Sequence, residues 1–167
     1  KSSAASDVYK RQILLSHHYR CNEKIIAFNN QKYYNNKLVI NSQSQADTPL
    51  IFKNIAGNTT NYKNTAPREA EEIIEFIKDN PDKSIGVITP FTNQKELIHA
   101  MLQENGMKDV PCGTVHAFQG DEKDVVLFSL ALTEQTGQGT YDWLKNNKEL
   151  INVATSRAKE QLVIPFL

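Results

Sequence analysis

Cysteine, glycine and proline are scarce in this chain of 167 residues, which holds two cysteines, seven glycines and six prolines. Cys21 and Cys112 are too few and too far apart in sequence for a disulfide framework or a paired-cysteine metal clip. His17 and His18 add ligand chemistry beside Cys21, but zinc needs a fourth donor and none is evident. We therefore expect reduced thiols and no metal site.

The chain also lacks an excess of either charge and lacks long hydrophobic runs. Nineteen basic residues balance nineteen acidic ones, so no bulk attraction draws the chain to nucleic acid or to an anionic membrane. A charged partner must then be met by a local patch. No apolar run approaches the roughly 18–20 residues that span a bilayer, and no secretory signal is present. We expect an intracellular, cytoplasmic protein.

The composition, 40% hydrophobic and 23% charged, suits one globular domain with its own core and excludes disorder or a fibre. Residues 1–12 show no hydrophobic periodicity and resemble translated adapter sequence, so we expect a non-native leader there. We expect a single domain over residues 13–167, truncated at its C-terminal end.

Hydrophobic periodicity predicts alternating helices and short strands along this domain. The expected helices cover residues 21–36, a segment that begins at Pro67, residues 93–105 and residues 149–159. The expected strands cover residues 50–52, 85–88, 110–115, 125–130 and 162–164. Such alternation predicts an α/β fold in three layers, with an open, mostly parallel sheet between two layers of helices.

Ligands of open α/β sheets usually meet the loops at the carboxyl ends of strands, and unusual side chains gather in such segments here. The segments are residues 15–21 (L-S-H-H-Y-R-C), 89–94 (T-P-F-T-N-Q), 113–124 (G-T-V-H-A-F-Q-G-D-E-K-D) and 152–158 (N-V-A-T-S-R-A). Together they resemble the motifs of the second, C-terminal RecA-like domain of superfamily 1 helicases, in the DNA2/NAM7-like branch. The resemblance runs from about residue 13 to residue 164, and its motifs follow the family's order. Ser156 stands where the family usually has threonine.

The resemblance implies a RecA-like fold of the P-loop NTPase type and an ATP-dependent helicase activity within a longer chain. It implies that Arg20 and Arg157 are catalytic arginine fingers, and that Tyr19, Gly120 and Glu122 bind ATP. A planar guanidinium suits the charge that develops on a transferring phosphoryl group. The alternatives from the residues alone are surface ion pairs for the arginines, a half-buried tyrosine, and a solvated turn around Glu122.

The family also places contacts to single-stranded DNA or RNA in loops that match strand ends of this chain. These residues are Thr89, Pro90, Thr92, Thr114 and His116, and Gln119 is expected to couple this loop to the ATP site. Hydroxyl and imidazole donors suit sequence-independent contact to a phosphodiester backbone. A buried histidine packed in the core is the alternative for His116.

A phosphate-binding P-loop is absent, because no glycine is followed by lysine, and no apolar strand ends in the Asp-Glu pair that would hold Mg²⁺. ATP with Mg²⁺ is therefore expected to bind between this domain and an N-terminal RecA-like domain of the same full-length chain, which would carry the Mg²⁺ ligands. We expect this fragment alone to be inactive. The alternative function is a non-catalytic α/β docking module that retains the fold.

Overall fold

The computed structural model describes residues 17–18, 22–33, 39–40, 47–55, 64–118 and 122–166. Most of the candidate site residues fall within these ranges. Tyr19, Arg20, Gln119 and Gly120 lie outside the described residues.

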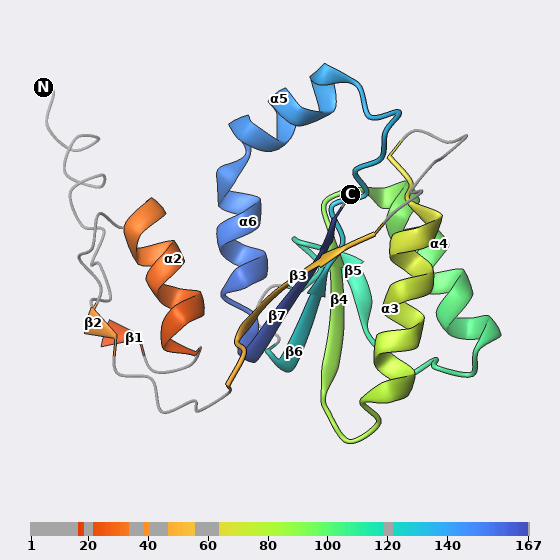
Figure 1. The fold of residues 1–167 in the computed structure, drawn as a ribbon, viewed down its shortest axis with the longest axis horizontal. Coiled ribbons are helices and arrows are strands. Elements are labelled where there is room, and N and C mark those ends of the chain that lie inside the picture. The colour runs from red at the N-terminus through yellow and green to blue at the C-terminus, as the bar shows by residue number, and fades with distance from the viewer. Residues whose placement is uncertain are drawn as a thin grey trace, which may run out of the picture.

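Five parallel strands form the central sheet, in the order β3-β7-β6-β4-β5 (Figure 1). Their bounds are β3 Leu50–Asn54, β4 Ile85–Thr89, β5 Cys112–Thr114, β6 Lys123–Phe128 and β7 Ala158–Phe166. Because all five run the same way, their starts share one edge of the sheet, the amino edge, and their ends share the opposite, carboxyl edge. A separate parallel pair joins β1 (His17–His18) to β2 (Val39–Ile40).

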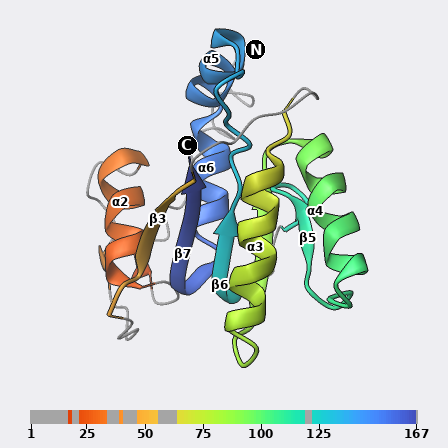
Figure 2. The ribbon, with the colours of Figure 1, turned by 45° about the vertical axis from the view of Figure 1, so that its right-hand side comes forward.

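Helices cover both faces of the sheet (Figure 2). On one face, α3 (Pro67–Asp79) and α4 (Thr92–Glu104) pack on Val87 of β4 and Val125 and Leu127 of β6. On the other face, α2 (Glu23–Tyr33) and α6 (Lys148–Thr155) pack on Ile88, Val126 and Phe128. Successive strand residues thus enter opposite layers, as a sheet buried on both faces requires. The predicted three-layer α/β fold is confirmed.

The expected helices on the first face are found within one residue of their predicted ends. In α3, the buried Ala70, Ile73, Ile74 and Ile77 repeat at helical spacing, and Pro67 occupies the first turn, where its missing N–H costs nothing. Gly106 follows α4 with φ of 74°, a left-handed conformation that ends a helix and that glycine adopts without strain.

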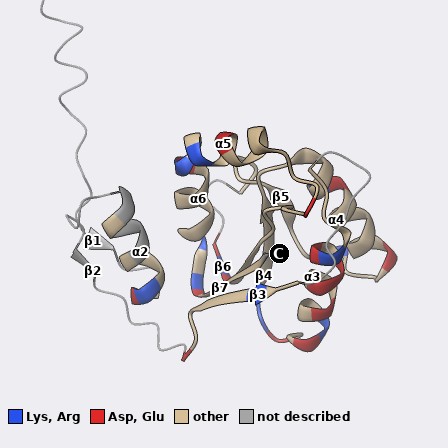
Figure 3. Cartoon of the chain, turned by 45° about the horizontal axis from the view of Figure 1, so that its top comes forward, with Lys and Arg blue, Asp and Glu red and all other residues tan. Residues whose placement is uncertain are grey.

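The last predicted helix is too long. We expected it to run to residue 159, but α6 ends at Thr155 and Ala158 already pairs with Lys123 in the sheet. Residues from Ala158 onward extend as a strand because their backbone groups form hydrogen bonds with β6. α6 carries charge only in its first turn, in contrast to the charged residues spread along α3 (Figure 3).

Helix α5 (Gln138–Asn146) was not expected from the sequence. It lies beyond the carboxyl edge of the sheet (Figure 1), where its Leu144 joins a small buried cluster with Ala66, Phe91 and Ala131. No helix in the described part of the chain is long and apolar enough to cross a membrane.

Candidate functional site

Glu122 and Arg157 lie side by side at the amino edge of the sheet. Each directly precedes a strand, and these two strands are paired, with Lys123 opposite Ala158. The Lys123 N–H donates to the Arg157 carbonyl oxygen at 3.0 Å. The sequence predicted both residues for one ATP site, and the structure brings them together. Both residues precede their strands, so this pair lies at the amino edge of the sheet, whereas ligands of open α/β sheets usually meet the carboxyl ends of strands.

The turn between α6 and β7 fixes the backbone of Arg157. Its N–H donates to the Ala154 carbonyl at 3.2 Å, and the Ser156 hydroxyl donates to the Val153 carbonyl at 2.8 Å. The Arg157 Nε is buried and meets no hydrogen-bond acceptor among the described residues. An unsatisfied buried donor costs about 1–3 kcal/mol, so an oxygen-rich ligand that reached this guanidinium would recover that free energy.

Exposed polar pairs surround this edge. Asp124 accepts hydrogen bonds from the Ser84 hydroxyl at 2.7 Å and from the Ser84 N–H at 3.1 Å, and the hydroxyl bond is the main cause that lowers the pKa of the Asp124 carboxyl. Lys83 donates to Glu160 at 2.7 Å, and that bond raises the pKa of the Lys83 ammonium. These hydrogen-bonded pairs make the amino edge polar.

The carboxyl edge carries the residues predicted to contact nucleic acid. Thr114 ends β5 opposite Thr89 of β4, and the exposed His116 lies in the turn that follows β5. Pro90 and the exposed Thr92 continue from the end of β4. The structure therefore gathers Pro90, Thr92, Thr114 and His116 at one edge.

Thr89 is placed differently from these four residues. Its side chain is fully buried, and its hydroxyl accepts the Phe91 N–H at 3.3 Å. The hydroxyl therefore shapes the turn that leads into α4, and it does not face the surface.

A buried hydrogen-bond network supports this edge, and sequence reasoning missed it. The Glu69 carboxylate on α3 accepts from the Ser129 hydroxyl at 2.6 Å and from the Ala131 N–H at 3.0 Å. The Gln94 amide donates to the Ser129 hydroxyl at 2.9 Å and exchanges hydrogen bonds with the Ala66 backbone. Glu69, Gln94 and Ser129 are all fully buried. The network ties α3 and α4 to the chain that leaves β6.

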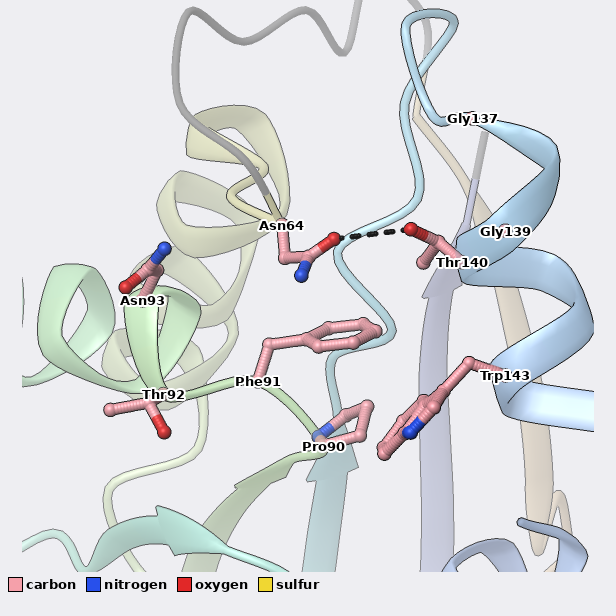
Figure 4. Close-up of a pocket in the computed structure, with 9 residues that line it drawn as sticks. All are labelled: Asn64, Pro90, Phe91, Thr92, Asn93, Gly137, Gly139, Thr140 and Trp143. Atoms are coloured by element: carbon pink, nitrogen blue, oxygen red, sulfur yellow. Dashed lines mark hydrogen bonds between the residues drawn. The ribbon is translucent and has the colours of Figure 1, made fainter. Parts of the chain in front are cut away.

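A cavity of about 750 Å³ opens beside this network, between the start of α4 and the start of α5 (Figure 4). Its lining includes Pro90, Phe91 and Trp143. The sequence signal that could have found it is a lone tryptophan in a polar stretch next to two glycines, Gly137 and Gly139. Sequence reasoning did not use that signal.

Phe118 fills the space over two glycines of neighbouring strands. A Cβ on Gly86 of β4 would lie 2.8 Å from the Phe118 ring, and a Cβ on Gly113 of β5 would lie 3.2 Å from it. Phe118 thus packs on the sheet at the end of the described turn that contains His116. The predicted coupling residue, Gln119, comes next in the chain and lies outside the described residues.

Neither metal-ligand nor thiol chemistry is evident in the described part of the chain. No group of three His, Cys, Asp or Glu side chains there could hold a metal ion. Cys112 is a free thiol, and burial raises its pKa to about 12, so it is protonated and unreactive at neutral pH.

Comparison with known proteins finds relatives that are named as helicases. The chain is 29% identical to an uncharacterized ATP-dependent helicase of Methanocaldococcus jannaschii, over 90% of this chain and 26% of that protein. It is 31% identical to the DNA polymerase alpha-associated DNA helicase A of Saccharomyces cerevisiae, over 87% of this chain and 26% of that protein. The chain thus spans about a quarter of the length of these relatives.

The same fold occurs in the crystal structure of the C-terminal domain of a possible DNA helicase from Lactobacillus plantarum. The two structures superpose with a TM-score of 0.57 over 89% of this chain and 87% of that one, at 15% sequence identity. The family model described as AAA domain matches residues 2–165. The chain therefore belongs to the AAA domain family, as a C-terminal domain of the superfamily 1 helicase type.

Proposed function

We propose that this domain is the C-terminal motor domain of an ATP-dependent helicase, and that it supplies Arg157 as an arginine finger to an ATP site shared with an N-terminal RecA-like domain. One observation carries the proposal. Arg157 and Glu122 stand together at the amino edge, and the buried Arg157 Nε has no acceptor among the described residues.

In this proposal, Arg157 donates hydrogen bonds to oxygens of the γ-phosphate, whose negative charge grows during transfer. Glu122 accepts hydrogen bonds from the ribose hydroxyls or senses the phosphate end. Arg20 acts as a second finger, Tyr19 stacks on the nucleotide, and Gly120 lets the backbone approach it. The N-terminal domain supplies the P-loop and the Mg²⁺ ligands, and Mg²⁺ neutralises phosphate charge when it is bound.

The nucleic-acid side of the proposal uses the carboxyl edge. Pro90, Thr92, Thr114 and His116 contact the backbone of a single strand of DNA or RNA, whereas the buried Thr89 shapes their loop. Gln119 and Phe118 connect this edge to Glu122. Closure of the two domains on ATP then shifts the strand relative to the grip of the N-terminal domain.

The test is ATP turnover by a chain that includes the N-terminal domain. We expect Arg157→Ala to lower kcat by about 10³-fold or more, as loss of a finger arginine does elsewhere, with a smaller change in nucleotide affinity. Arg157→Lys retains the charge but not the planar fork, so we expect it to restore little of the rate. Arg68→Ala is the matched control, because Arg68 pairs with Glu71 on the exposed surface of α3.

Near-normal turnover of Arg157→Ala would return this arginine to a structural role. A different outcome would reject the motor function itself. If the wild-type two-domain chain hydrolyses no ATP in the presence of single-stranded DNA or RNA, the docking-module function replaces the motor function.

A further inference from the structure

Three rings form one wall of the cavity between α4 and α5. In Figure 4 the rings of Pro90, Phe91 and Trp143 point toward one another. The centroids of Phe91 and Trp143 are 5.5 Å apart, with the ring planes tilted by 40°. Phe91 is 9% exposed and holds the indole from the protein side, whereas Trp143 remains 41% exposed. An indole that is supported from inside and open to a cavity is suited to bind a flat ring.

Another part of the cavity lining is polar. The Thr140 hydroxyl donates to the Asn64 Oδ1 at 3.3 Å, and in Figure 4 this hydrogen bond lies above the Phe91 ring, with Pro90 and Trp143 below that ring. Asn64 has φ of 57°, a left-handed conformation that asparagine tolerates better than most residues. A side-chain amide offers both a donor and an acceptor, which is how proteins commonly recognise the edge of a base.

The lack of charged side chains among the described lining residues restricts the class of ligand further. None of the nine described residues that line the cavity is acidic or basic. A flat, uncharged, hydrogen-bonding group therefore fits the cavity better than a peptide carboxylate or an ammonium group does. A nucleobase has these properties.

The surroundings of the cavity suit the phosphates on either side of such a base. The first turns of α4 and α5 border the cavity, and neither contains an acidic residue or a side-chain cap. Their backbone N–H groups add positive potential beside the rings. Pro90 and Thr92 also line the cavity, so it is continuous with the carboxyl edge that carries Thr114 and His116.

We propose that Trp143 is a base-stacking residue: one unpaired nucleobase enters this cavity, stacks on the indole and meets Asn64 and Thr140 with its polar edge. The proposal deepens the nucleic-acid side of the proposed function and rests on it. It adds an aromatic contact to a surface otherwise expected to touch only the backbone.

Because Trp143 is the single tryptophan of the chain, its fluorescence reports directly on the cavity. The chain is titrated with a labelled single-stranded thymidine oligonucleotide of about 15 nucleotides, a usual site size. A second strand of the same length lacks the bases. Anisotropy of the label measures binding, and tryptophan emission measures stacking. We expect both strands to bind but only the strand with bases to quench Trp143.

Two substitutions and a control complete the test. Stacking on one base contributes about 1–3 kcal/mol, so Trp143→Ala should weaken binding of the thymidine strand by about tenfold or more. Trp143→Phe retains a ring and should lose less. Tyr141→Ala should change little, because Tyr141 is 42% exposed on the same helix but does not line the cavity.

The outcomes separate this inference from the proposed function. If the strand binds without quenching Trp143, and Trp143→Ala binds it equally well, the stacking role is overturned and the carboxyl edge remains a backbone-binding surface. If the strand does not bind at all, the nucleic-acid side of the proposed function fails together with this inference.

Discussion

The two edges of the sheet are built from different chemistry. The carboxyl edge rests on fully buried polar groups, Glu69, Gln94 and Ser129, and on the apolar cluster beneath α5. The amino edge is held by exposed pairs such as Lys83 with Glu160 and Ser84 with Asp124. Buried and satisfied networks rigidify a structure, whereas exposed pairs contribute little to its stability. The difference indicates that loop geometry is fixed at the carboxyl edge, whereas the amino edge can give up its residues to a ligand or a neighbouring domain at small cost.

The largest expected effect on stability is at the carboxyl edge. Glu69→Ala removes the acceptor of the Ser129 hydroxyl and of the Ala131 N–H and leaves a cavity. We expect the free energy of unfolding to fall by about 3 kcal/mol, measured by urea denaturation. Glu71→Ala on the exposed side of the same helix should cost less than about 0.5 kcal/mol. Equal effects of the two substitutions would show that the buried network does not stabilise the carboxyl edge.

An intermediate effect is expected where Phe118 packs on the sheet. Gly86→Ala would place a Cβ 2.8 Å from the Phe118 ring, so we expect a loss of about 2 kcal/mol from overpacking. Phe118→Leu should recover part of that loss in the double variant, and the double-mutant cycle measures this coupling. Gly139→Ala is the control, because its Cβ would meet nothing within 4 Å. Additive losses in the cycle would show that Phe118 does not act through Gly86.

The smallest expected effect is at the amino edge. Hydrogen bonds from Ser84 lower the pKa of Asp124 from its ordinary value of 3.8, so the charged carboxylate stabilises the fold above that pH. This contribution is lost as the pH falls below 3.8 and the carboxyl becomes protonated. Asp124→Asn should lower stability by about 1 kcal/mol or less at neutral pH. The difference from the wild type should shrink in acid, as thermal melts over a pH series would show.

The core of the fold could be predicted from sequence because it depends on local periodicity. The apolar run from Ile85 to Ile88 and the helical repeat that begins at Ala70 each allow one structure only. Helix α5 was missed because its glycine, threonine and tyrosine give no helical stripe, and Leu144 is its only buried side chain. Its position depends on tertiary packing against Phe91 and Ala131.

The sequence could identify the candidate site residues, but it could not show which of them lie close together in the fold. Glu122 and Arg157 meet because β6 and β7 are neighbours, and strand order is not encoded in either local segment. Thr89 looked the same as Thr92 in sequence, yet one is fully buried and the other is exposed. Side chains of a strand point alternately to the two faces of the sheet, and this rule can be applied from sequence. The sequence does not show at which residue β4 ends and the turn into α4 begins.

The two edges lie at opposite ends of β4, so a rotation of the rigid sheet at one edge displaces the other edge. Five strand residues at about 3.3 Å each separate the edges by about 17 Å. A rotation of about 15° at the amino edge, a size known for switching subunits, would sweep the carboxyl edge through about 4 Å. Parallel hydrogen bonding between β6, β4 and β5 transmits such a rotation without bending. Under the proposed function, the length of the strands would then set how far the bound nucleic acid is displaced by one rotation.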